Sequence, residues 1–140
     1  MPRRRPKALR AANWRPSEGV PVRRIRGVTA LTRVAVRRLE ERHYHVNAVH
    51  RALAGYVAVL RQPGRYLSGP QHLSPGIEPE DDRDLLAEVL PRLPAAARAD
   101  LGRIVDRLDR EYHRRTVPVP WPVRDWERGA GWWWRRLRER

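Results

Sequence analysis

Apolar residues recur at the spacing of an α-helix in three segments of the chain. The clearest pattern follows positions i, i+3, i+4, i+7 and i+11 and consists of Leu101, Ile104, Val105, Leu108 and Tyr112. Such spacing places apolar side chains on one face of a helix, which then packs against a neighbour. Helices are predicted over 28–61, 79–90 and 94–115, so the expected fold is all-α, a small three-helix bundle over residues 28–115.

The segment 28–61 is predicted to be the central helix of this bundle. Thr29 is a suitable N-cap, and large apolar residues then recur every seven positions, at Leu39, Val46, Leu53 and Leu60. A second stripe of small residues accompanies them, consisting of Ala48, Ala52, Gly55 and Val59. Two apolar stripes require neighbours on two sides of the helix. Its arginine-rich N-terminal half is expected to extend beyond the end of the bundle.

The two flanking regions lack helical spacing. Residues 1–27 contain four prolines and two glycines without an apolar period, which predicts a flexible, disordered or extended basic arm. Residues 116–140 begin with alternating prolines, which remove backbone donors and fix φ. We therefore expect a Pro/Trp-rich extended tail that lies over the bundle as a strap.

Positive charge is concentrated near the N-terminus. The chain has 30 Lys and Arg against 16 Asp and Glu, a formal charge of +14, and residues 1–26 hold nine of these cations and only Glu18. A basic arm on a nearly balanced body is typical of proteins with a phosphate-rich partner, although a solvated tail is the alternative. The candidate nucleic-acid-binding residues are Arg3, Arg4, Arg5, Lys7, Arg10, Arg23, Arg24, Arg26, Arg33, Arg37, Arg38 and Arg42.

Tryptophans cluster near the C-terminus. Three adjacent residues, Trp132–Trp134, cannot all face one core, so at least one of them is expected to be exposed. Together with Arg135 and Arg136, they could stack on unpaired bases, anchor a protein partner or contact a membrane surface. Trp121 and Trp126 are expected instead to complete the small helical core.

Several classes of site are not favoured by the residue types present. The chain has no cysteine and no apolar run near the ~20 residues needed to cross a bilayer, so we expect a soluble, cytoplasmic protein. A single Glu40-x-x-His43 pair does not make a metal site, and His45 is expected to be a buried, hydrogen-bonded histidine. The acidic residues 78–84 are interpreted as capping a helix, with docking of the basic arm as a further hypothesis. We predict no cofactor, metal or catalytic residues.

Three motifs stand in the C-terminal 60 residues: Leu-Pro-Arg-Leu-Pro-Ala-Ala-Ala-Arg-Ala-Asp-Leu at 90–101, Leu-Asp-Arg-Glu-Tyr at 108–112 and Arg-Thr-Val-Pro at 115–118. Through these motifs and its Trp-rich end, this part of the chain resembles short uncharacterised Arg/Trp-rich proteins of high-G+C bacteria. The resemblance implies a bacterial, cytoplasmic, non-enzymatic protein. We therefore expect a non-catalytic accessory protein that binds nucleic acid or another polyanion. The alternative is a protein-interaction or assembly subunit that uses Trp132–Trp134 as its anchor.

Overall fold

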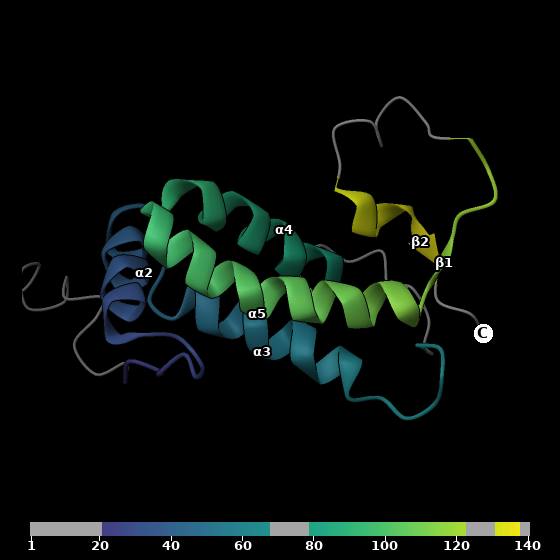
Figure 1. The fold of residues 1–140 in the computed structure, drawn as a ribbon, viewed down its shortest axis with the longest axis horizontal. Coiled ribbons are helices and arrows are strands. Elements are labelled where there is room, and N and C mark those ends of the chain that lie inside the picture. Colours follow the sequence, from purple (N-terminus) through teal and green to yellow (C-terminus); the bar gives the residue numbers. More distant parts are fainter. Residues whose placement is uncertain (1–20, 68–78, 123–130, 138–140) are drawn as a thin grey trace, which may run out of the picture.

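The computed structural model describes residues 21–67, 79–122 and 131–137. The mostly helical class is confirmed, but these residues form four α-helices rather than the three predicted. The helices are α2 (Ala30–His43), α3 (Ala48–Leu60), α4 (Pro79–Val89), which continues into a 3-10 turn (Leu90–Arg92), and α5 (Ala95–Arg114). In Figure 1, α3, α4 and α5 run along the length of the molecule, whereas α2 lies at one end.

The single helix predicted over 28–61 is wrong, because the chain breaks between α2 and α3. Asn47 has φ 64°, in the left-handed region that asparagine adopts more readily than most L-residues. The preceding residues 43–46 are His, Tyr, His and Val, which are poor helix formers. The first turn of α3 is stabilised from α2 instead, because the Glu40 carboxylate accepts a hydrogen bond from the Val49 N–H at 3.3 Å. His45 is exposed at this break, so its predicted burial is also wrong.

The last residues of the predicted arm pack against the helices. Ile25 and Val28 are buried in the core. The Arg23 N–H donates to Asn47 Oδ1 at 2.7 Å, and Asn47 Nδ2 donates to the Pro21 carbonyl at 3.0 Å. The expectation of a flexible arm up to residue 27 is therefore wrong for residues 21–27. The sequence did not reveal this packing, because two buried side chains do not form a periodic apolar pattern. Residues 1–20 lie outside the described part of the chain.

The core lies where α3, α4 and α5 meet. Its fully buried side chains include Tyr56, Leu86, Leu101 and Tyr112, and the rings of Tyr56 and Tyr112 are 5.8 Å apart. Small residues on α3 allow a close approach to α4: a Cβ added to Gly55 would lie 2.1 Å from Asp82 Oδ2.

Burial beside Gly55 raises the pKa of Asp82 to about 6, and the neighbouring Asp81 carboxylate raises it further against the opposing charge of Arg51. Because the folded pKa lies above the unfolded value, ionisation of Asp82 lowers stability as the pH rises from about 4 through 6. We expect Asp82→Asn to increase the free energy of unfolding by about 1–2 kcal/mol at pH 8, after allowance for partial exposure. Urea melts at pH 8 and pH 4 test this. The gain should shrink at pH 4, and an equal gain from Asp106→Asn, an exposed control, would contradict the role of burial.

The acidic residues of α4 have structural partners in addition to their place in its first turn. Pro79 begins α4, as predicted. The buried Glu80 accepts a 2.6 Å hydrogen bond from the Tyr112 hydroxyl. Asp84 Oδ1 accepts hydrogen bonds from the indole N–H groups of Trp133 and Trp134, at 2.8 and 2.9 Å. Helix capping alone is therefore an incomplete interpretation of this cluster. Docking of the basic arm stays a prediction, because residues 1–20 lie outside the described part.

The C-terminal tail folds back on itself. After α5, strand β1 (Val117–Pro118) pairs antiparallel with β2 (Arg136–Leu137), which follows a 3-10 turn (Trp132–Arg135). An extended strap throughout 116–140 is therefore wrong. Trp133 is buried in the core, and Trp132 and Trp134 are half-buried, so the expectation that at least one of the three is exposed is wrong. Trp121 is instead 41% exposed and does not complete the core, and Trp126 lies outside the described residues.

Candidate nucleic-acid interface

A groove of about 330 Å³ lies between the segment 22–25 and α2. Four of the arginines predicted to bind phosphate line this groove, namely Arg23, Arg24, Arg33 and Arg37. Two of them come from the N-terminal segment and two from α2, so the fold brings together residues up to 14 positions apart. Val22 and Val34 add apolar surface to the same groove.

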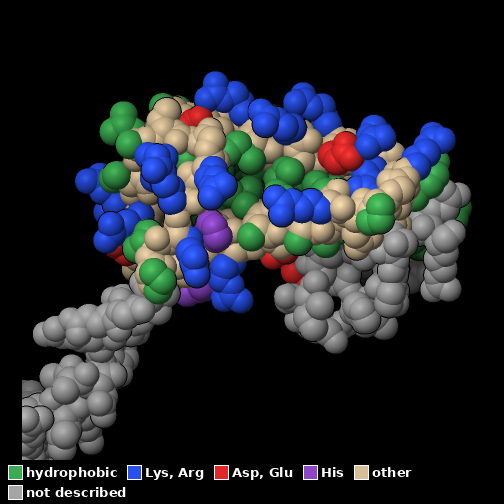
Figure 2. Space-filling model, turned by 90° about the horizontal axis from the view of Figure 1, so that it is seen from below, with side chains coloured by type: hydrophobic (Ala, Val, Ile, Leu, Met, Phe, Trp, Pro, Cys, Tyr) green, Lys and Arg blue, Asp and Glu red, His purple; other side chains and the backbone are tan. Residues whose placement is uncertain are grey.

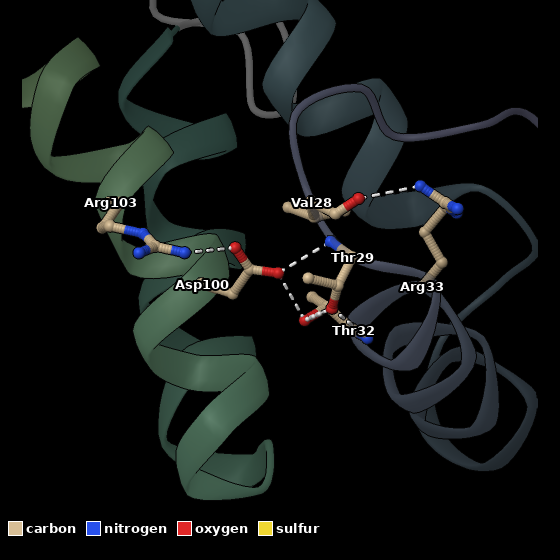
Figure 3. A network of polar contacts seen from close by, with 6 residues as sticks. All are labelled: Val28, Thr29, Thr32, Arg33, Asp100 and Arg103. Carbon is tan, nitrogen blue, oxygen red and sulfur yellow. Dashed lines mark hydrogen bonds and ion pairs between the residues drawn. The ribbon is translucent and has the colours of Figure 1, made fainter.

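The groove is held in place from both sides. Asn47 fixes the segment at Pro21 and Arg23, as described above. On the other side, Asp100 of α5 anchors the start of α2 (Figure 3): its Oδ2 accepts hydrogen bonds from the Thr29 N–H at 2.8 Å and from the Thr32 hydroxyl at 2.7 Å. The predicted N-cap is confirmed, since Thr29 Oγ1 accepts a hydrogen bond from the Thr32 N–H. These links make the groove a built feature of the fold.

Asp100 is suited to this anchoring role. Hydrogen bonds from the Thr29 N–H and the Thr32 hydroxyl, together with the guanidinium of Arg103 at 2.7 Å, hold the pKa of the Asp100 carboxyl well below its usual range. The carboxylate is therefore ionised throughout the neutral pH range and accepts all three bonds. Arg33 donates in turn to the Val28 carbonyl at 2.8 Å, which orients one groove arginine (Figure 3).

The groove has an excess of positive charge. Arg23 and Arg24 are exposed, and within the described residues neither guanidinium has a carboxylate partner. Arg37 pairs with Glu41 at 3.2 Å, but both side chains are exposed, so water weakens this pair. Glu40 also lines the groove, and burial raises its pKa against the lowering effect of the Val49 and Ala48 N–H groups. Four arginines thus face one buried carboxyl group, an arrangement that favours an anion.

The remaining predicted cations are distributed differently. Arg26, Arg38 and Arg42 are exposed but do not line the groove. The five cations of residues 3–10 (Arg3, Arg4, Arg5, Lys7 and Arg10) lie outside the described part of the chain. Figure 2 shows that Lys and Arg side chains cover far more of one face of the molecule than Asp and Glu do. Exposed basic side chains therefore also lie outside the groove.

The helical apolar spacing of α2 does not mark its buried face alone. Leu31 and Val34 belong to this spacing but are 83% and 46% exposed, whereas Ala35 and Leu39 are partly buried against the core. Val22 of the preceding segment is 60% exposed. The buried face consists of Thr32, Val36 and Glu40, spaced four residues apart. This i, i+4, i+8 spacing was the available signal, but two of its three members are polar.

A second groove, of about 420 Å³, lies beside β1 and β2, at the opposite end of the molecule from α2 (Figure 1). Its walls include Trp121 and Trp132, together with the predicted residues Arg135 and Arg136. Arg136 is also anchored, because its Nε donates to Thr116 Oγ1 at 2.9 Å. Trp133 and Trp134 do not line this groove, since their indole N–H groups bind Asp84 on another side of the tail.

The described residues contain no cluster of three or more His, Asp or Glu side chains placed to hold a metal ion. None of the described helices is both long enough and apolar enough to cross a lipid bilayer. No protein-family model, curated protein or solved structure matches the chain, so the expected resemblance to proteins of high-G+C bacteria stays a prediction.

Proposed function

We propose that this chain is a small non-catalytic accessory protein that binds nucleic acid or another polyanion. The proposed contact, called the N-terminal basic surface, consists of the four groove arginines and the five cations of residues 3–10. The supporting observation is the groove beside α2, where four arginines face a single buried carboxyl group. Residues 3–10 contribute five further cations in the sequence. A cytoplasmic location stays a prediction.

The physical basis is the release of counterions from phosphates. Each phosphate that a guanidinium neutralises frees condensed cations into solution, and this gain in entropy falls as the salt concentration rises. Such contacts read the charge of the backbone and carry no base sequence. We therefore expect affinity without strong sequence preference, because the proposed contacts are made with phosphates.

The groove is tested by neutralising its three arginines whose side chains make no bond to the backbone. The variant Arg23→Gln/Arg24→Gln/Arg37→Gln is expected to weaken binding of a fluorescent DNA duplex and to make the log–log salt slope less negative by about 2–3. Fluorescence anisotropy across a salt series measures both quantities. The matched control, Arg61→Gln/Arg65→Gln/Arg92→Gln, removes the same charge from exposed positions outside the groove.

An equal loss of affinity in the two triple variants would mean that only net charge matters, and the groove would lose its assigned role. Wild-type binding that does not change with salt would contradict the proposed function altogether. Circular dichroism melts of both triple variants test whether the fold is retained. We expect that it is, because the substituted arginines are exposed in both variants.

A protein-interaction function is the second candidate, and one observation favours it. Val22, Leu31 and Val34 are exposed apolar residues beside the arginines, and mixed apolar and arginine surfaces are common at protein interfaces. This surface replaces the Trp132–Trp134 anchor as the favoured contact, because Trp133 is buried and both Trp133 and Trp134 are bonded to Asp84. Leu31→Ser separates the two candidates: it should leave polyanion binding unchanged and should disrupt a protein contact.

A further inference from the structure

The groove at the C-terminal end of α5 combines aromatic and cationic walls. Trp121 contributes an exposed indole from the residues that follow β1, and Trp132 contributes a second indole from the 3-10 turn. His113, Arg135 and Arg136 complete the polar part of the wall, and no Asp or Glu is among the described residues that line it. Flat aromatic surfaces beside guanidinium groups suit a ligand that has both an aromatic ring and a negative charge.

The groove is preformed by contacts within the tail and between the tail and α5. The ring of Trp132 lies 6.0 Å from Tyr112 in an edge-on arrangement, 5.8 Å from Trp133 and 5.8 Å from His113. The Val119 N–H donates to the Arg135 carbonyl at 3.0 Å, so the segment that leads to Trp121 is tied to the turn that holds Trp132. A ligand would therefore meet walls that are already in position, which lowers the entropic cost of binding.

A row of arginines leads from this groove along the outer face of α5. Arg103, Arg107, Arg110 and Arg114 are all exposed, and spacings of four, three and four residues place them within about 60° of helix surface. The row extends about 16 Å along the axis. Arg103 and Arg114 form surface pairs with Asp100 and Glu111, whereas Arg107 and Arg110 pair with no described carboxylate. Arg114 directly follows His113, which lines the groove.

We propose that the Trp121/Trp132 groove holds an unpaired base of a single-stranded nucleic acid, whose adjoining phosphates follow the α5 arginines. This inference rests on the proposed function and names its ligand class. A free nucleotide shares the base and the phosphate, but it would leave the α5 row unoccupied. A duplex presents no unpaired base, so it uses the basic surface without the groove.

The test compares two labelled probes by fluorescence anisotropy with the full chain: an oligothymidylate of about 12 nucleotides and a duplex of equal length. Trp121→Ala is expected to weaken binding of the single strand by ~5–150-fold and to leave duplex binding unchanged. Trp121→Phe keeps an aromatic face and should restore much of the loss. Leu31→Ala removes an exposed apolar side chain of α2, far from this groove, and serves as the matched control. Thermal melts by circular dichroism establish that every variant is folded.

The outcomes separate this inference from the function on which it rests. If Trp121→Ala leaves the single-strand affinity unchanged, the groove assignment is overturned. The proposed function is still supported in that case if duplex binding depends on salt and is reduced by Arg23→Gln/Arg24→Gln/Arg37→Gln. If adenosine monophosphate competes as tightly as the oligonucleotide, the ligand is a free nucleotide and the assignment of a single strand is overturned. If neither probe binds in a salt-dependent way, both the proposed function and the groove assignment are overturned.

Discussion

Neutralising the five cations of residues 3–10 by substitution with Gln is expected to weaken polyanion binding by ~100-fold or more at physiological salt. These residues, Arg3, Arg4, Arg5, Lys7 and Arg10, hold five of the nine cations in the first 26 residues. Each phosphate contact contributes about −0.9 to the slope of log K against log salt concentration, so losing five makes the slope less negative by about 4–5. Anisotropy titrations of a DNA duplex at several salt concentrations measure both changes.

The control for this variant removes the same charge elsewhere. Five exposed arginines outside the α2 groove are replaced by Gln in the control: Arg51, Arg61, Arg65, Arg92 and Arg98. Long-range attraction acts in both variants, but direct phosphate contacts are lost only in the first. If the two variants lose affinity equally, the N-terminal residues have no special role and binding reflects net charge alone.

Arg83→Met is expected to lower the free energy of unfolding by about 3–5 kcal/mol, because it leaves the Asp109 carboxylate buried without its cation. Arg83 donates to Asp109 through Nε at 2.8 Å and through Nη2 at 3.0 Å, with side chains only 10% and 14% exposed. Its guanidinium carbon also lies 4.1 Å from the centre of the Trp133 ring. One residue therefore joins α4, α5 and the tail. The free energy of unfolding of a small domain is about 5–15 kcal/mol in total, so this loss is a large share of it.

The double variant Arg83→Met/Asp109→Leu shows whether the isolated charge causes this loss. Without the carboxylate, an apolar pair of similar volume is expected to recover most of the stability in urea melts. The Tyr56 hydroxyl, which donates to Asp109 Oδ1 at 3.0 Å, then loses its partner and limits the recovery. A loss below about 1 kcal/mol for Arg83→Met alone would contradict a buried ion pair of this importance.

Local patterns predicted the helices that are stabilised by one continuous apolar face. α5 begins and ends within one residue of its predicted bounds, because its apolar spacing is unbroken and Pro94 precedes it. The break between α2 and α3 was missed, because the repeat from Leu39 to Leu60 continues across it. What breaks the helix is the left-handed backbone at Asn47, whose side chain binds a segment more than 20 residues earlier. Such a distant partner leaves no trace in local spacing.

The candidate interface was predicted in part for the same reason. Charge counting singled out Arg23, Arg24, Arg33 and Arg37, and the fold brings them to one groove. It could not predict that Asp84 binds two of the three adjacent tryptophans, since 49 and 50 residues separate the partners. Nor did it predict that Trp121 stays exposed, because that depends on the way in which β1 and β2 pair.

The most direct measurement of polyanion binding is the affinity of the intact chain for a DNA duplex across a salt series. Contact with about eight phosphates, five at residues 3–10 and three at the α2 groove, predicts a straight line of log K against log salt concentration with a slope near −7. A slope near zero, or no binding at low salt, would contradict the role assigned to the N-terminal basic surface.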